Sequence, residues 1–243
     1  MTKEYALHEV PTQEELSIVK QWIYEEYLLN NRQFGFYCNW NLIEKGFEEQ
    51  RVIIFSFEDK PLGLVLWSEY DGYVDIDIFV IAPSQRGLGL GRSIFAEMLS
   101  RYFQEKEIFA LKLFCSPKES VSFWRDKLGF IQYPDRGYSE SSLTFYKTLI
   151  PITPCTDILD TPYRLELWDV EEYLATCRPP RWVWNIESDL KRYPIIQPCN
   201  CNWNIRLIND NTIVKEDKVK YFGYKSYYYE RGDFLYIDNL NIY

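Results

Sequence analysis

The chain has 243 residues, of which 47% are hydrophobic and 26% are charged, enough for a packed core with an extension beyond it. A net charge of −9 argues against nonspecific nucleic-acid binding, which depends on excess Lys and Arg, and mildly favours a cationic partner. No apolar run reaches the length of a membrane span, and residues 1–10 lack the apolar core of a signal peptide. We therefore expect a cytoplasmic protein with no nucleic-acid or membrane partner.

Six cysteines without a secretion signal are expected to be reduced thiols. Only Cys199 and Cys201 lie close together in the sequence, and His8 is the single histidine. Two neighbouring thiols and one remote imidazole make a poor zinc site, so no metal is expected. The scarcity of histidine also makes a carboxylate the more plausible general base.

The first part of the chain alternates predicted helices and strands. Thr12 and Glu15 form a capping box ahead of a helical apolar pattern that ends near Asn30. The patterns that follow predict a helix over residues 41–49 and strands over residues 51–57 and 62–68.

The next predicted strand covers residues 73–81. Its alternation puts two aspartates on one face and an unbroken apolar set on the other. The first face comprises Asp75, Asp77, Phe79 and Ile81, and the second comprises Val74, Ile76, Ile78 and Val80. A strand of this kind suits a core on one side and a cleft on the other.

Beyond a glycine-rich connection, the pattern predicts a helix from Ser93 and another from Ser116 to Gly129. Ser116 has the residue type of an N-cap, with Pro117 at the first helical position. The intervening and following strands are predicted over residues 109–115, 130–133 and 142–149. This order of elements predicts an α/β (α+β) domain with a mixed sheet over residues 1–150.

Residues 151–243 differ from residues 1–150 in their sequence pattern, which predicts a small β-rich extension. Asp169 with Glu172 suggests the cap of a short helix. The segment 209–211 predicts a hairpin turn between strands at 203–208 and 212–214, and Arg231-Gly232 predicts another between 225–229 and 234–237.

Aromatic residues are concentrated in this extension. They include Trp168, Trp182, Trp184, Trp203, Tyr221, Phe222, Tyr224 and the run 227–229. Packing within a small β module is the favoured interpretation. An acceptor-recognition surface or a homodimer interface is left open.

The most informative segment joins the strand at 73–81 to the next helix and runs Gln85-Arg86-Gly87-Leu88-Gly89-Leu90-Gly91-Arg92. Alternate glycines let the backbone turn tightly and approach a ligand, and the helix start directs free N–H groups at one point. This predicts an anion site suited to a pyrophosphate. The spacing is G-x-G-x-G rather than the dinucleotide G-x-G-x-x-G, and no Gly-Lys-Ser/Thr ending follows. A coenzyme A loop and a simple tight turn remain.

The segment Arg86 to Gly91 resembles the cofactor motif Q/R-x-x-G-x-G/A of the GNAT N-acetyltransferase superfamily. Ile81-Ala82-Pro83 resembles the family's lead-in to this motif. Ser122-Phe123-Trp124 followed by Leu128-Gly129-Phe130 resembles its second motif. The resemblance covers about residues 5–150 and does not extend to residues 151–243.

The resemblance implies a GNAT-like mixed, mostly antiparallel sheet flanked by helices, with acetyl-CoA as cosubstrate and no metal. The strands at 73–81 and 109–115 are expected to splay apart, with the pantetheine arm along the first. The implied cofactor-binding residues are Phe79, Val80, Ile81, Gln85, Arg86, Gly87, Leu88, Gly89, Leu90, Gly91, Arg92, Ser93, Ser122, Phe123 and Trp124.

The family's reaction implies direct transfer of an acetyl group to a primary amine, so the expected partner is a small-molecule or peptide amine acceptor. The base candidates are Asp75 and Asp77, because two carboxylates on one strand face can raise each other's pKa, and Glu69 on the preceding strand is a third. A solvated strand face or a salt bridge is the alternative for each aspartate. The second motif lacks the tyrosine that many family members use as an acid. The alternatives for this role are Tyr133, Tyr138, Ser122 and water. A catalytically silent acyl-CoA-binding regulatory protein or adaptor is the alternative.

Overall fold

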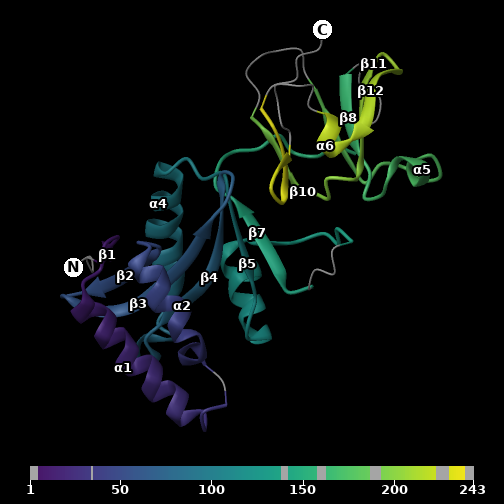
Figure 1. The fold of residues 1–243 in the computed structure, drawn as a ribbon. Coiled ribbons are helices and arrows are strands. Elements are labelled where there is room, and N and C mark those ends of the chain that lie inside the picture. The colour runs from purple at the N-terminus through teal and green to yellow at the C-terminus, as the bar shows by residue number, and fades with distance from the viewer. Residues whose placement is uncertain are drawn as a thin grey trace. The chain divides into compact units, whose positions relative to one another are not determined.

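The computed structural model describes residues 5–33, 35–137, 142–157, 163–186, 193–222 and 230–238. Contacts divide the chain into two compact units (Figure 1). The first comprises Met1–Gln132 and Leu143–Leu149, and the second comprises Tyr133–Ser142 and Ile150–Tyr243. The chain therefore passes between the units three times. Within the described residues, no helix is both long and apolar enough to cross a bilayer.

A seven-stranded sheet forms the centre of the first unit, in the order β1-β2-β3-β4-β5-β7-β6. The strands are β1 (Tyr5–His8), β2 (Val52–Phe57), β3 (Lys60–Glu69), β4 (Tyr73–Ile81), β5 (Ala110–Phe114), β6 (Ile131–Gln132) and β7 (Thr144–Thr148). Only β4 and β5 run parallel; every other neighbouring pair is antiparallel. The predicted mixed, mostly antiparallel sheet is thus confirmed, although β1 was not predicted.

Helices flank this sheet (Figure 1). They are α1 (Gln13–Leu29), η1 (Phe36–Asn39), α2 (Trp40–Glu48), η2 (Pro83–Gln85), α3 (Leu90–Ser93), η3 (Ile94–Leu99), α4 (Ser100–Glu105), η4 (Lys118–Ser120) and η5 (Phe123–Lys127). The predicted capping box of α1 is confirmed: the Thr12 hydroxyl accepts from the Glu15 N–H, and the Glu15 carboxylate accepts from the Thr12 N–H.

Two helix starts differ from the prediction. The glycine loop ends earlier than expected, because α3 begins at Leu90 and continues through η3 into α4. Ser116 caps no helix. Pro117 has an extended backbone (φ −71°, ψ 163°), so the helical turn begins only at Lys118.

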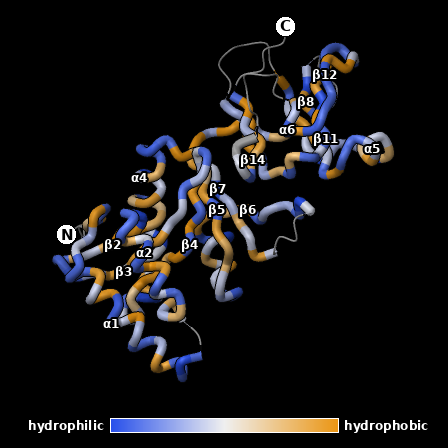
Figure 2. Tube along the Cα trace, in the orientation of Figure 1, coloured by the Kyte–Doolittle hydropathy of each residue, from blue (hydrophilic) through white to orange (hydrophobic). Residues whose placement is uncertain are grey.

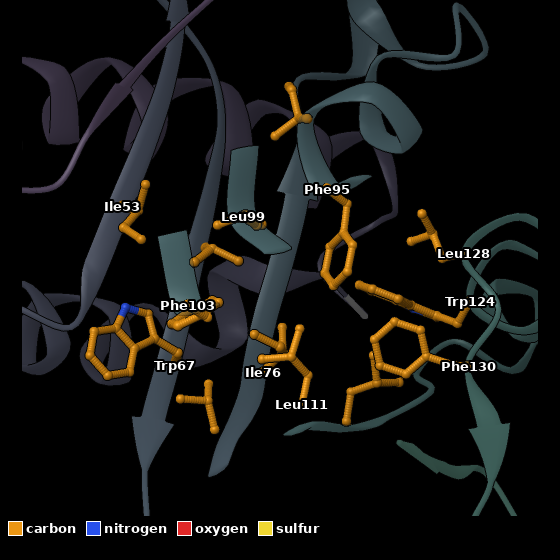
Figure 3. Close-up of a cluster of buried hydrophobic side chains, with 14 of the residues drawn as sticks. Ile53, Trp67, Ile76, Phe95, Leu99, Phe103, Leu111, Trp124, Leu128 and Phe130 are labelled. Carbon is orange, nitrogen blue, oxygen red and sulfur yellow. The ribbon is translucent and has the colours of Figure 1, made fainter. Parts of the chain in front are cut away.

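Hydrophobic side chains form a separate core on each face of the sheet, and Figure 2 shows the hydrophobic positions concentrated along its strands. One core joins the sheet to α3, η3, α4 and η5. Figure 3 shows its centre, where the ring centroid of Trp124 lies 5.3 Å from those of both Phe95 and Phe130. The other core joins β2, β3 and β4 to α1 and α2 through Val19, Ile43 and Leu64, among others.

Strand β4 carries a β-bulge at Asp77. Leu66 of β3 pairs with Ile78, and Trp67 pairs with Ile76, so Asp77 is the extra residue. An extra residue reverses the side-chain alternation beyond it, because successive side chains point to opposite faces.

The bulge makes the predicted division of β4 into an apolar and an acidic face wrong. Before the bulge, Val74 and Ile76 pack into the core beneath α3 and α4; after it, Ile81 and Phe79 do so. Ile78 and Val80 instead join the core beneath α1 and α2. Each half of β4 thus contributes apolar side chains to a different face.

The second unit contains two antiparallel sheets, in the orders β12-β11-β8-β9 and β10-β14-β13. Its elements are β8 (Tyr163–Leu167), α5 (Glu172–Ala175), β9 (Trp182–Asn185), β10 (Ile195–Pro198), β11 (Asn204–Asn209), β12 (Thr212–Lys218), α6 (Val219–Phe222), β13 (Glu230–Arg231) and β14 (Phe234–Ile237). The hairpin turn at 209–211 is confirmed by the pairing of β11 with β12. The predicted strand at 225–229 lies outside the described residues, and β8, β9 and β10 were not predicted.

A core of its own stabilises the second unit. Trp184 and Trp203 are buried in it, which confirms the packing interpretation for these aromatics. Trp168 is also buried and donates from its indole N–H to the Arg178 carbonyl. Asp169 does not cap α5, because the residue at the N-cap position is Glu171. The Asp169 carboxylate instead lies 2.8 Å from the Arg181 guanidinium.

The segment 133–137, which follows β6, is held inside the second unit by a buried arginine. The Arg136 side chain donates to the carbonyls of Cys199 and Asp233 at 3.1 Å and forms an ion pair with the Asp233 carboxylate at 2.9 Å. The Arg136 carbonyl in turn accepts from Asn200. A buried guanidinium satisfied in this way fixes the course of the segment.

Candidate active site

The glycine loop after β4 has the backbone that its sequence predicts. Gly87 and Gly89 have φ angles of 77° and 79°, in the left-handed region that favours glycine. A Cβ atom at either position would meet nothing within 4 Å, so the loop presents bare backbone to its surroundings. The helix then starts at Leu90, directly after Gly89.

Consecutive N–H groups of this loop have no acceptor within the described part of the chain. The N–H groups of residues 87–91 donate to no backbone carbonyl, whereas those of Arg92 and Ser93 both donate to the Gly89 carbonyl. Unpaired N–H groups at a helix start carry partial positive charge and suit an anion. The loop therefore offers the backbone donors that the predicted anion site requires, and the binding of an anion there stays a prediction.

The two arginines of the loop differ in their surroundings. Arg86 is engaged: its guanidinium forms a two-point ion pair with Glu26 of α1, and its Nε donates to the Ile81 carbonyl at 2.8 Å. Arg92 is exposed and has no ion-pair partner in the described residues. Of the two arginine side chains, only that of Arg92 is uncommitted. Gln85 and Ser93 are partly buried, and Leu88 is 69% exposed.

Strand β4 loses its neighbour at the bulge. The ladder with β5 ends at the pair Ile76–Leu113, although β4 continues to Ile81. The Ala82 N–H donates to Leu62 of β3, so by alternation Phe79 and Ile81 direct their backbone polar groups away from β3. This edge can therefore bind an extended ligand chain, as expected for the splayed strands.

Asp77 has a perturbed pKa. Partial desolvation raises the pKa of its carboxyl, and the negative charge of Asp75 raises it further. The Ser68 hydroxyl, which donates to Asp77 Oδ2 at 2.7 Å, acts in the opposite direction. An exposed carboxylate with a raised pKa at the point where β4 and β5 part suits a general base.

The other two carboxylates have different surroundings. Asp75 forms an ion pair with Lys112 of β5, its Oδ2 lying 3.3 Å from Nζ. Glu69 pairs with Val74, one position beyond the Ser68–Asp75 pair, so it lies on the opposite face of the sheet. The structure therefore brings Asp75 and Asp77 together and separates Glu69 from both.

Sequence reasoning did not find Ser68 or Lys112. Lys112 carried a usable signal, because it is the one charged residue in an otherwise apolar strand. Ser68 carried none, since its contact with Asp77 depends on the bulge.

The aromatic helix after β5 packs against the glycine loop. The Phe123 ring stacks on Phe79 with centroids 6.2 Å apart, and a Cβ at Gly91 would lie 3.3 Å from the Phe123 ring. Ser122 is exposed, whereas Trp124 is buried in the core and so serves packing. Gly91 therefore permits the close approach of the loop to this helix.

Cys115 and the two acid candidates Tyr133 and Tyr138 have the side-chain types for thiol or acid chemistry. Cys115 is fully buried, and burial raises the pKa of its thiol, which is the reverse of an activated nucleophile. Tyr133 is buried in the second unit, with its ring 5.8 Å from that of Phe234. Tyr138 lies outside the described residues. The role of Tyr133 as an acid stays a prediction.

Residues 14–130 match the model of the acetyltransferase (GNAT) family. This part of the chain is a GNAT domain, and its sheet flanked by helices is the GNAT-like fold that the sequence predicted. No curated protein matches the chain.

Several solved structures are similar to the chain. Ard1 from Thermoplasma volcanium is 13% identical, with 60% of this chain and 99% of that one covered and a TM-score of 0.44. The PaiA N-acetyltransferase from Thermoplasma acidophilum, in complex with coenzyme A, is 15% identical, with 60% and 99% covered and a TM-score of 0.46. The GNAT family N-acetyltransferase YhbS from Escherichia coli, in complex with CoA, is 14% identical, with 62% and 84% covered and a TM-score of 0.47.

Proposed function

We propose that the protein is an N-acetyltransferase that moves the acetyl group of acetyl-CoA to a primary amine. The observation that carries this proposal is the run of N–H groups at residues 87–91, which lack acceptors within the described chain and open a helix directly after β4. A pyrophosphate fits such a site because the loop presents backbone donors without side chains at Gly87 and Gly89.

The chain's own groups divide the remaining tasks. The free edge of β4 at Phe79 and Ile81 orients the thioester arm, and Phe123 packs against Phe79 and the end of the loop at Gly91. Asp77 accepts the proton that the attacking amine loses, directly or through water. The reaction forms the amide C–N bond and breaks the thioester C–S bond, and a proton returns to the departing sulfur.

A silent acyl-CoA-binding protein is the second candidate, favoured by one observation. The helix η5 presents Phe123 and Trp124 where many family members carry a tyrosine, and neither ring can donate a proton to the leaving sulfur. In this case acetyl-CoA binds, but no amine is acetylated.

Thermal unfolding with and without acetyl-CoA tests the proposal. A ligand that binds the native state raises Tm in a dose-dependent way. Gly89→Glu, which places a carboxylate in the loop, is expected to abolish this rise. Gly129→Glu is the matched control, because Gly129 also has a left-handed φ (71°) and free space around its Cβ but lies outside the loop.

A rise in Tm that Gly129→Glu retains and Gly89→Glu loses supports the cofactor site. A wild type that shows no rise with acetyl-CoA or longer acyl-CoAs contradicts it. An amine panel, assayed by release of free coenzyme A thiol, then separates the two candidates: turnover of at least one amine supports the enzyme, and none supports the silent protein.

A further inference from the structure

A single guanidinium joins three parts of the first unit. Arg86 follows β4 by five residues, and both of its terminal nitrogens pair with the carboxylate of Glu26 in the last turn of α1. The distance between Arg86 Nη2 and Glu26 Oε2 is 2.8 Å. Its remaining nitrogen, Nε, donates at 2.8 Å to the carbonyl of Ile81, the last residue of β4.

Glu26 is poorly placed unless a cation is nearby. The C-terminal end of a helix carries partial negative charge, so a carboxylate there is unfavourable. Helix α1 has no basic residue in its last turn. The Arg86 guanidinium supplies this missing cation, and only 21% of the Glu26 side chain remains exposed beside it.

A phosphate can bind the Arg86 guanidinium only by displacing both the Glu26 carboxylate, which pairs with its two terminal nitrogens, and the Ile81 carbonyl, which accepts from its Nε. The backbone N–H groups of residues 87–91 and the exposed Arg92 require no such exchange. We infer that Arg86 is a positioning residue, which together with Glu26 clamps the start of the loop to α1 and β4 and does not contact the cofactor's phosphates.

The clamp also changes what β4 offers a ligand. The Ile81 carbonyl points away from β3, toward the free edge, and Arg86 occupies it. The edge therefore presents the N–H of Ile81 and both backbone groups of Phe79. Loss of the clamp is expected to disturb the loop and this edge at once.

Glu26→Gln and Arg86→Gln separate the clamp from a phosphate contact. This inference rests on the proposed function where acetyl-CoA affinity is measured. If both residues act through their pair, each variant weakens acetyl-CoA binding to a similar extent, up to about fivefold, and the double variant is no weaker than either. The salt dependence of binding stays as in the wild type, because no phosphate contact is lost.

A direct phosphate contact predicts the opposite pattern. Glu26→Gln would then release Arg86 and tighten binding, while Arg86→Gln alone would weaken it and reduce its salt dependence. That result overturns the inference, and so does unchanged affinity in both variants. Glu44→Gln is the matched control, because it removes another ion pair of α1, with Lys20 at 3.0 Å, that does not reach the loop.

A charge swap adds a sharper comparison. Combining Glu26→Arg with Arg86→Glu restores the ion pair but puts a negative charge at the loop. Affinity that recovers above either single swap supports the clamp, whereas a further loss shows that residue 86 faces phosphate.

Hydrogen exchange in the absence of cofactor makes the outcome independent of the proposed function. Faster exchange at residues 87–91 in both Glu26→Gln and Arg86→Gln, but not in Glu44→Gln, supports the clamp even if acetyl-CoA does not bind. Unchanged exchange in both variants overturns it.

Discussion

Asp77→Asn is the substitution that most directly examines the proposed chemistry. An asparagine keeps the shape of the side chain and an oxygen that accepts from Ser68, whose hydroxyl lies 2.7 Å from Oδ2. It removes the negative charge and, with it, the ability to take up a proton. A positioned general base contributes roughly 10²–10⁴-fold to the rate, so kcat is expected to fall by about that factor. The KM for acetyl-CoA should change little, because Asp77 lies outside the glycine loop.

The raised pKa of Asp77 fixes the sign of the stability effect. The folded state holds the Asp77 proton more tightly than the unfolded state, so this group stabilises the fold only at low pH. That contribution is lost as the pH rises through the folded pKa. At neutral pH the charged carboxylate is therefore mildly unfavourable in the fold. Asp77→Asn is expected to melt no lower than the wild type.

The pH–rate profile supplies the assay, measured as release of coenzyme A thiol with the amine that turns over fastest. The wild type should lose activity as the pH falls through the Asp77 pKa, which is raised from the ordinary aspartate value. Ser68→Ala removes the hydrogen bond that lowers this pKa, so the acid limb should move to higher pH.

Asp75→Asn is the control for these variants. It breaks the 3.3 Å ion pair with Lys112, which is expected to cost about 1 kcal/mol of stability with a small effect on kcat. Asp77→Asn with more than half the wild-type kcat, or with the acid limb still in place, would refute Asp77 as the base.

Two further predictions concern other parts of the chain. Arg136→Gln breaks a buried ion pair and is expected to destabilise the second unit by about 3–5 kcal/mol in chemical denaturation. Arg181→Gln, which breaks an exposed ion pair, should cost under about 1 kcal/mol. Equal losses of stability in the two variants would contradict this prediction. Cys155 is exposed like Cys38 and Cys177, but partial desolvation and the nearby charge of Asp157 raise the pKa of its thiol to about 11, so its alkylation at pH 8 should be slower than theirs. Mass spectrometry of the alkylated protein checks the order, and equal rates would disprove it.

Local sequence determined much of the first unit. The capping box at Thr12 and Glu15 fixes the start of α1 through bonds that span only three residues. Gly87 and Gly89 dictate the turn, because their left-handed positions exclude most side chains. These short-range features are readable because each depends on neighbouring residues, and together with Phe123-Trp124 and Leu128-Gly129-Phe130 they identified the family.

Pairing between distant residues was decided only by the tertiary structure. The bulge at Asp77 arises from a shift in the pairing register of β3 and β4. No sequence pattern within residues 73–81 indicates this shift. The same bulge separates Phe79 from Asp75 and places Ser68 against Asp77. A one-residue shift in register reverses every later side chain, so a face inferred from alternation holds only as far as the first bulge.

Long-range ion pairs show the same limit. The sequence supplied Arg86 as a cation beside the predicted anion site, which made a phosphate contact the natural interpretation. Only the fold brings Glu26 next to it from 60 positions away. Likewise, residues 133–142 group with the second unit through contacts such as Arg136 with Asp233. Sequence specifies backbone conformation over a few residues, but the partner of a charged side chain is settled by which distant segments the core brings together.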